Sequence, residues 1–193
     1  KRYFDIDEPL CEDNCREVWD KCNRLLATED FRAQSLIKRS GVEVICTTDD
    51  PADSLEYHQA LRGFEVKVLP TFRPDRATDI AKDSFVDYMA EVGVSDFDGL
   101  ISWLRSRVEY FDGCGCRLSD HAVDKMDDDI IEKLVFLGEE YAKRGWVWQL
   151  HIGALRNNNT RMFEKLGPDT GFDSINDFEI AEGLSRILNE LDK

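Results

Sequence analysis

The chain opens with apolar residues at helical spacing and then changes period. Helices are predicted at 12–26 and 29–39, the second opened by Thr28 as a cap and ended by Gly41. The segment 42–48 is short, β-branched and almost wholly apolar, which predicts a strand covered on both faces.

The first predicted strand ends at two acidic residues and a proline. Asp49 and Asp50 precede Pro51, so these carboxylates are expected to cap a helix that runs to Leu61. His58 falls inside that helix beside Tyr57 and is interpreted as a surface or core-edge residue.

The order of strand and helix then repeats along the chain. The further predicted strands are 65–72, 114–119 and 146–151, and the further predicted helices are 79–91, 97–111, 130–144 and 177–191. An acidic loop at 127–129 and a turn-rich segment at 167–174 lie between them. Strand followed by helix, four times over, predicts an α/β fold with a parallel sheet and helices packed outside it.

Each predicted strand ends in, or is followed closely by, charged or titratable side chains of the kinds that bind substrates or transfer protons. These residues are Asp49 and Asp50, then Arg73 and Asp75, then Asp120 and His121, then His151 and Arg156. In β/α architectures the carboxyl ends of the strands form the site, so these side chains are expected to converge. A surface salt bridge is the alternative for Arg73, whereas His151, at a strand end between apolar residues, favours a functional role.

Composition narrows the classes of partner. The 193 residues carry a formal net charge of -15, which disfavours binding to nucleic acid or to anionic membranes. No membrane span or signal peptide is recognised, so a soluble cytoplasmic protein is expected. The six cysteines are expected to be free thiols. The spacing within two groups, Cys11, Cys15 and Cys22 and then Cys114 and Cys116, does not fit a zinc site, so these five are expected to be buried as small hydrophobic residues.

The predicted strands are too few for a complete barrel. A (β/α) barrel needs eight strands and typically about 250 residues, and no GxGxxG loop supports a doubly wound sheet instead. Residues 1–193 are therefore interpreted as one α/β domain, the central part of a longer TIM-barrel enzyme. Within it, 1–40 form a helical lead-in and 41–193 form the β/α units.

Four segments carry a resemblance to a known family. They are CTTDDPADSLEYH (46–58), VLPTFRPD (68–75), GCRLSDH (115–121) and GWVWQLHIGALRNNNTRMFEKLGPDTGFDSI (145–175). With them the whole chain resembles uronate isomerase, also called glucuronate isomerase. The resemblance implies an amidohydrolase-like TIM barrel that interconverts D-glucuronate with D-fructuronate and D-galacturonate with D-tagaturonate.

The resemblance also suggests roles for individual residues. His151, Asp120 and Arg156 are expected to be catalytic, and Arg73, Arg156, His121 and Asn157 are expected to bind the substrate. Isomerisation through an enediol-like intermediate needs a base, an oxyanion donor and a carboxylate clamp. Guanidinium groups suit the clamp or the oxyanion role, and Asp120 could act as the base or orient the imidazole of His121 or His151.

The chain departs from the family in two places. The His-x-His pair and the late Asp that hold a divalent metal such as Zn²⁺ in the family have no counterpart, so the main metal ligands are expected outside this chain. The connection between His121 and Ile130 is shorter than is usual in the family. The chain alone is therefore expected to be inactive, and homo-oligomers are compatible with the sequence.

Two other functions remain open at this point. One is a metal-dependent hydrolase of the amidohydrolase type, because one fold supports many reactions. The other is a non-catalytic fragment that associates through its exposed sheet edges.

Overall fold

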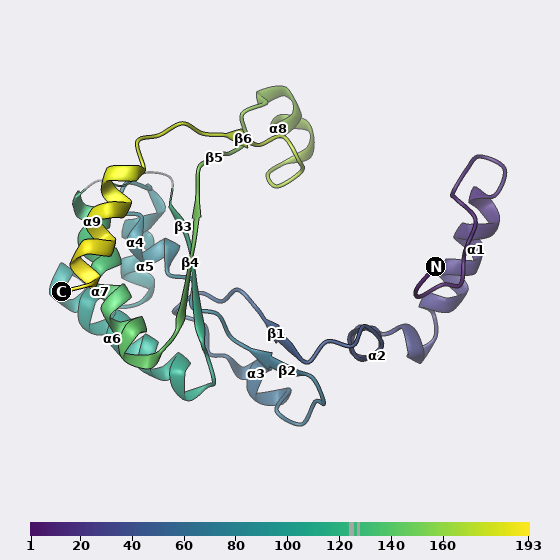
Figure 1. Cartoon of the computed structure of the whole chain (residues 1–193), viewed down its shortest axis with the longest axis horizontal. Helices are drawn as coiled ribbons and strands as arrows, with labels where there is room; N and C mark the ends of the chain where they lie inside the picture. Colours follow the sequence, from purple (N-terminus) through teal and green to yellow (C-terminus); the bar gives the residue numbers. More distant parts are fainter. Residues whose placement is uncertain (124–125, 127) are drawn as a thin grey trace. The chain divides into compact units, whose positions relative to one another are not determined.

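The computed structural model describes residues 1–123, 126 and 128–193 (Figure 1). Its helices are α1 (Cys15–Leu26), the 3-10 turn η1 (Glu29–Phe31), α2 (Ala33–Arg39), α3 (Glu56–Ala60), α4 (Asp75–Thr78), α5 (Ser84–Glu91), α6 (Phe97–Gly113), α7 (Asp128–Arg144), α8 (Thr160–Leu166) and α9 (Ala181–Leu191). Its strands are β1 (Val44–Cys46), β2 (Lys67–Leu69), β3 (Leu118–Val123), β4 (Val147–Ile152), β5 (Ala154–Leu155) and β6 (Ser174–Ile175).

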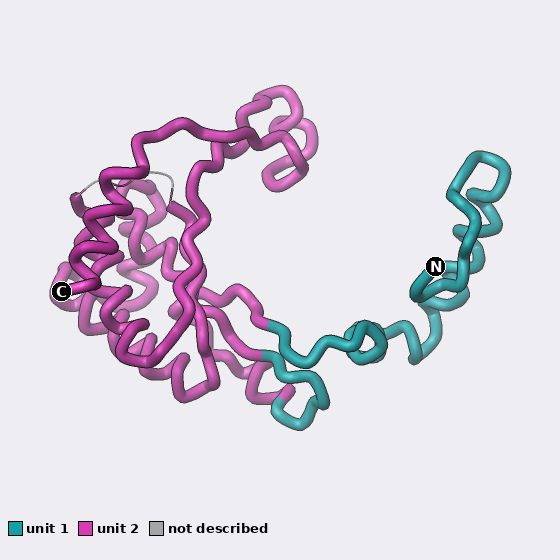
Figure 2. Tube along the Cα trace, viewed as in Figure 1, with its two compact units in different colours: residues 1–45, 62–68 teal, residues 46–61, 69–193 magenta. Residues whose placement is uncertain are grey.

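The chain divides into two compact units (Figure 2). The first contains residues 1–45 and 62–68, and the second contains residues 46–61 and 69–193. The first unit holds α1, η1 and α2, and the ring of Phe4 packs 5.2 Å from the ring of Phe31. The predicted helix 29–39 is thus a 3-10 turn followed by α2, and the Thr28 side chain makes no cap hydrogen bond.

The longest strand pair of the second unit is parallel, as the sequence predicts. β3 and β4 pair in parallel register, with Asp120 opposite Gln149 and Ala122 opposite His151. Isolated parallel bridges join Asp49 to Phe72 and Phe72 to Ser119. The segments after β1 and β2 therefore continue toward β3, which gives four neighbouring parallel segments. The short pair β5 and β6 is antiparallel and was not predicted.

Helices pack on one side of β3 and β4, where α4 to α7 and α9 all lie in Figure 1. The core there is aromatic: the ring of Phe72 meets the ring of Phe111 edge-on at 5.1 Å, and Tyr141 stacks on Trp146 at 5.5 Å. α6 begins at Asp96, whose carboxylate accepts a hydrogen bond from the Gly99 N–H at 2.8 Å. Within the described part of the chain, no helix has the length and apolarity needed to cross a membrane.

The third strand begins later than the pattern predicts. Residues 114–117 are not in the strand, because α6 extends to Gly113 and Gly115 turns the chain with a φ of +97°. β3 instead runs to Val123, so Asp120 and His121 lie inside the strand rather than after it. Successive strand residues point to opposite faces, so these two side chains cannot share a site.

Several local expectations about the first strand are wrong. Val44 of β1 is 46% exposed, so this strand is not covered on both faces within the chain. The following helix starts only at Glu56, and neither Asp49 nor Asp50 caps it. Asp50 instead accepts hydrogen bonds from Ala52 N–H at 2.9 Å and from a tyrosine hydroxyl of α5.

The cysteines are free, in line with the prediction, but most are not buried. Cys116 is buried, Cys22 and Cys114 are partly exposed, and Cys11, Cys15 and Cys46 are exposed. The prediction of burial is therefore wrong for Cys11 and Cys15. Every residue of α1 is at least partly exposed, which explains why Cys15 is open to solvent.

Candidate active site

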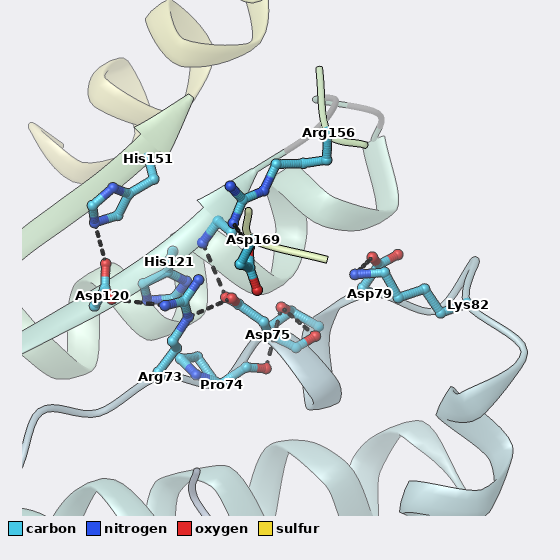
Figure 3. A network of polar contacts seen from close by, with 12 residues as sticks. Arg73, Pro74, Asp75, Asp79, Lys82, Asp120, His121, His151, Arg156 and Asp169 are labelled. Carbon is cyan, nitrogen blue, oxygen red and sulfur yellow. Dashed lines mark hydrogen bonds and ion pairs between the residues drawn. The ribbon is translucent and has the colours of Figure 1, made fainter. Parts of the chain in front are cut away.

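Polar side chains gather at the carboxyl ends of β2, β3 and β4. Nε2 of His151 lies 2.5 Å from Oδ1 of Asp120, and Nη1 of Arg73 donates a hydrogen bond to Oδ2 of Asp120 at 3.3 Å. Figure 3 shows His151, Asp120 and Arg73 in one continuous network. The sequence predicted that residues from three different strand ends would meet, and for these three the structure brings them together.

Strand alternation explains which face carries the cluster. Val147, Gln149 and His151 are exposed on one face of β4, while Trp148, Leu150 and Ile152 are partly buried against the helices. Asp120 lies opposite Gln149 in the ladder, so its carboxylate shares the open face with His151. The His151 side chain is 65% exposed and that of Asp120 only 10%.

Asp75, which was among the strand-end residues expected to converge but was given no role, is a fourth member of the cluster. Its Oδ2 accepts a hydrogen bond from Nε of Arg73 at 2.8 Å, and its Oδ1 accepts one from the Ala122 N–H at 3.1 Å. Burial raises the pKa of Asp75, and the hydrogen bond from Arg73 only partly offsets this effect. The pKa of Arg73 is raised, chiefly by the hydrogen bond to Asp75. The Arg-Pro-Asp spacing was the available signal, since a proline ends the strand between the two partners.

His121 lies on the opposite face of β3, away from the cluster. Its ring is 1% exposed, its Nε2 lies 3.0 Å from the Tyr141 hydroxyl, and Tyr141 and Trp148 pack edge-on against it. Burial lowers the pKa of His121 to about 3, and the charge of Arg73 acts in the same direction. The substrate-binding role predicted for His121 therefore gives way to packing of a neutral imidazole.

Arg156 follows β4 on the excursion formed by β5, α8 and β6. Its guanidinium pairs with Asp173 at 2.5 Å and with Asp169 at 3.2 Å, and these contacts raise the pKa of Arg156. The Asn157 N–H also donates to Asp173, at 2.8 Å. In the described residues no hydrogen bond joins Arg156 or Asn157 to Asp120 or His151. The structure thus places these two residues on the adjoining loop rather than in the cluster.

The other asparagine and histidine of interest have structural partners. Asn159 caps α8, since its Oδ1 accepts a hydrogen bond from the Met162 N–H at 3.1 Å. Nε2 of His58 lies 2.8 Å from the Thr47 hydroxyl and 3.7 Å from Asp49, and its side chain is largely buried. His58 is therefore a core-edge residue, as predicted.

A resident metal does not fit these residues by themselves. Across residues 1–123, 126 and 128–193, histidine, cysteine and carboxylate side chains form no group of three that could hold an ion. The Asp120 carboxylate is already engaged by Arg73 and His151.

The fold and the cluster define a class of protein before any comparison is made. Parallel strands that each lead into helices, with an acid, an imidazole and a guanidinium at their carboxyl ends, are typical of β/α proteins that bind small polar molecules there.

The sequence model of the family "Glucuronate isomerase" matches residues 1–133 and 128–193. This chain belongs to the glucuronate isomerase family, and the resemblance found in the sequence is confirmed. It is 41% identical to the uronate isomerase of Caldanaerobacter subterraneus and 44% identical to that of Caldicellulosiruptor saccharolyticus. Both alignments cover 100% of this chain and 49% of the relative, so the chain spans about half the length of these relatives.

Solved structures show the same fold. The uronate isomerase of Thermotoga maritima superposes with a TM-score of 0.84 at 31% identity, over 99% of this chain and 50% of that one. The glucuronate isomerase of Caulobacter crescentus superposes with a TM-score of 0.81 at 24% identity, over 97% and 47%.

The alignments also bear on the connection after β3. Relatives align over 229 or 230 positions with the 193 residues of this chain, so they contain residues that it lacks. The two family matches meet at 128–133, next to the connection predicted to be short. Part of that connection and of the predicted acidic loop, at 124–125 and 127, lies outside the described residues.

Proposed function

We propose that the protein carrying this chain is a uronate isomerase with a (β/α) barrel of the amidohydrolase type. It would interconvert D-glucuronate with D-fructuronate and D-galacturonate with D-tagaturonate. The observation that carries the proposal is the network of Arg73, Asp120 and His151 at three neighbouring strand ends, in a chain of the glucuronate isomerase family.

The geometry supports a division of labour among these residues. An imidazole held by a carboxylate at 2.5 Å can move a proton between C2 and C1 of the sugar, while the carboxylate fixes its orientation and stabilises its charged form. This favours the second of the two roles considered for Asp120, that of the partner that orients an imidazole. The guanidinium of Arg73 offers the planar donors that bind a carboxylate.

Arg156 and Asn157 enter the proposal from the loop after β4. The Arg156 guanidinium is exposed and bound to two aspartates, so it would have to exchange those partners to reach a sugar acid. We assign these two residues to substrate contacts at the rim, and we leave His121 out because its ring is buried on the other face.

The proposal extends to surroundings that the whole protein would provide. A divalent metal such as Zn²⁺ would be held mainly by residues outside this chain, and the full barrel would include strands outside it. Six free thiols support a reducing compartment, the cytoplasm. Assembly into homo-oligomers stays a prediction.

The test is turnover by the protein at its full length. D-glucuronate and D-galacturonate should each yield the ketose, with deuterium entering the product in D₂O if the transferred proton exchanges with solvent. Asp120→Asn should lower kcat/KM about 100-fold or more, since it removes the group that holds the imidazole. Arg161→Lys, a change of an exposed arginine in α8, is the control and should retain activity.

Other outcomes would point to the rival functions. Hydrolysis of simple esters or amides, with no conversion of uronates, would favour the hydrolase. A full-length protein that acts on neither class of substrate would support the non-catalytic alternative.

A further inference from the structure

The hydrogen-bond ladder between the end of β2 and β3 stops at a proline. Asp120 N–H donates to the Phe72 carbonyl at 3.0 Å, and Phe72 N–H donates to a carbonyl of β3. The next rung of a parallel ladder would use residue 74, both as donor and as acceptor for Ala122 N–H. Pro74 has no N–H, and the chain turns there into α4. Oδ1 of Asp75 takes over as the acceptor for Ala122, at 3.1 Å.

The second oxygen of Asp75 fixes the orientation of Arg73. Oδ2 accepts from Nε at 2.8 Å, while Nη1 is held by Asp120 at 3.3 Å. In the part of the chain that the structure describes, Nη2 of Arg73 makes no hydrogen bond. Two of the three guanidinium nitrogens, Nε and Nη1, are therefore bonded to aspartates, which fixes the orientation of the group (Figure 3). The third nitrogen, Nη2, is available to donate to a ligand.

A simpler role for Asp75 would be that of a negative charge in the first turn of α4. That role needs only an exposed carboxylate near the helix start. The side chain of Asp75 is instead only 21% exposed, and α4 has only four residues. One carboxylate oxygen contacts Arg73, which follows β2, and the other contacts the Ala122 N–H of β3. Burial of a carboxylate costs stability. The two separate contacts of the Asp75 oxygens, with Arg73 and with the Ala122 N–H, therefore favour a more specific role than that of a helix-end charge.

We propose that Asp75 is a positioning residue, which locks the Arg73 guanidinium so that Nη2 faces the carboxylate of the sugar acid. This inference rests on the proposed isomerase function and deepens it. Asp75 touches no reacting atom in this arrangement and acts through Arg73. Its loss should therefore weaken substrate binding more than the proton transfer.

The experiment compares Asp75→Asn with Asp79→Asn in the full-length protein. Asp79 ends the same helix and pairs with Lys82 at 2.8 Å, away from Arg73, so it is a matched control. The KM for D-glucuronate should rise about tenfold or more in D75N, the effect of weakening one charge-assisted hydrogen bond, with kcat within about threefold. D79N should keep both constants.

Each outcome decides something. An active parent whose D75N variant keeps the parent KM, or loses kcat alone, overturns the role of Asp75 and leaves the isomerase function standing. A parent without uronate turnover overturns both. If D75N does not fold, Asp75→Glu is used instead. Glutamate keeps the negative charge at position 75, but its longer side chain displaces the guanidinium of Arg73 from its position. The KM of this variant should rise several-fold, and an unchanged KM would overturn the inference.

Discussion

The burial of His121 predicts how the stability of the protein depends on pH. The ring is 1% exposed, and burial followed by the charge of Arg73 lowers its pKa from 6.5 to about 3. Between these two pKa values the unfolded chain binds a proton on His121, whereas the folded chain does not. The stabilisation from neutral His121 is complete above the unfolded pKa and is lost as the pH falls toward the folded one.

The size of the effect follows from the two pKa values. Between about pH 7.5 and about pH 5 the unfolded state gains the proton almost fully and the folded state does not, which removes on the order of 2 kcal/mol. Many carboxylates also titrate in acid, so the parent protein alone cannot isolate this contribution. The difference between the parent and His121→Phe can, because phenylalanine fits the edge-on contacts with Tyr141 and Trp148 but binds no proton.

The assay is urea unfolding of both proteins at the two pH values. His121→Phe removes the contact between the imidazole and the Tyr141 hydroxyl, a cost that is the same at both pH values because burial raises the pKa of Tyr141 well above its usual range. Tyr141→Phe is the control, since it keeps the buried imidazole and should show the pH dependence of the parent. Equal pH dependence in the parent and His121→Phe would refute the reasoning, because it would mean that water reaches the imidazole.

Two further predictions concern packing elsewhere in the chain. Burial raises the pKa of Cys116 to about 11, so a thiol reagent near neutral pH should modify exposed Cys46 quickly and Cys116 only after unfolding, as mapped by peptide mass spectrometry. Gly183→Ala in α9 should destabilise the protein by about 1–3 kcal/mol, because the added Cβ would lie 2.5 Å from Cβ of Met126. At Gly113 no atom lies within 4 Å of an added Cβ, so Gly113→Ala should be neutral or slightly stabilising. Thermal unfolding of both variants and the parent checks these two predictions.

The parallel order of strands was predictable because apolar runs and helical spacing alternate along the chain. The residues at which each strand begins and ends were less predictable, because backbone hydrogen bonds between strands determine them. Residues 114–117 read as a strand from their composition, yet the turn at Gly115 delays β3 until Leu118. The strand also continues to Val123, beyond its predicted end at Ser119, so Asp120 and His121 lie within it and alternation places their side chains on opposite faces.

The site was predictable in its residue types and only partly in its contacts. Asp120, His151 and Arg73 meet because parallel strands place their carboxyl ends at one edge. Asp75 was expected at the same edge but was given no role, because its partners, an N–H of β3 and a guanidinium, are visible only once the ladder is known. The aspartates that hold Arg156 lie 13 and 17 residues beyond it, and no periodicity links such positions.

The face of β4 that carries His151 is open to solvent in this chain. Val147 is 61% exposed and His151 65%, on the same face of β4 that carries the polar cluster. Water at such a face weakens each electrostatic contact, since the effective dielectric there is several times that of a closed site. An exposed apolar side chain on the same face as an exposed imidazole is what the inner face of an unfinished sheet would present. Cover from further strands would bury Val147, exclude water from the pair of Asp120 and His151, and leave Nη2 of Arg73 as a donor inside a closed pocket. Activity should therefore appear only when those strands are present, even though this chain carries the acid, the imidazole and the guanidinium.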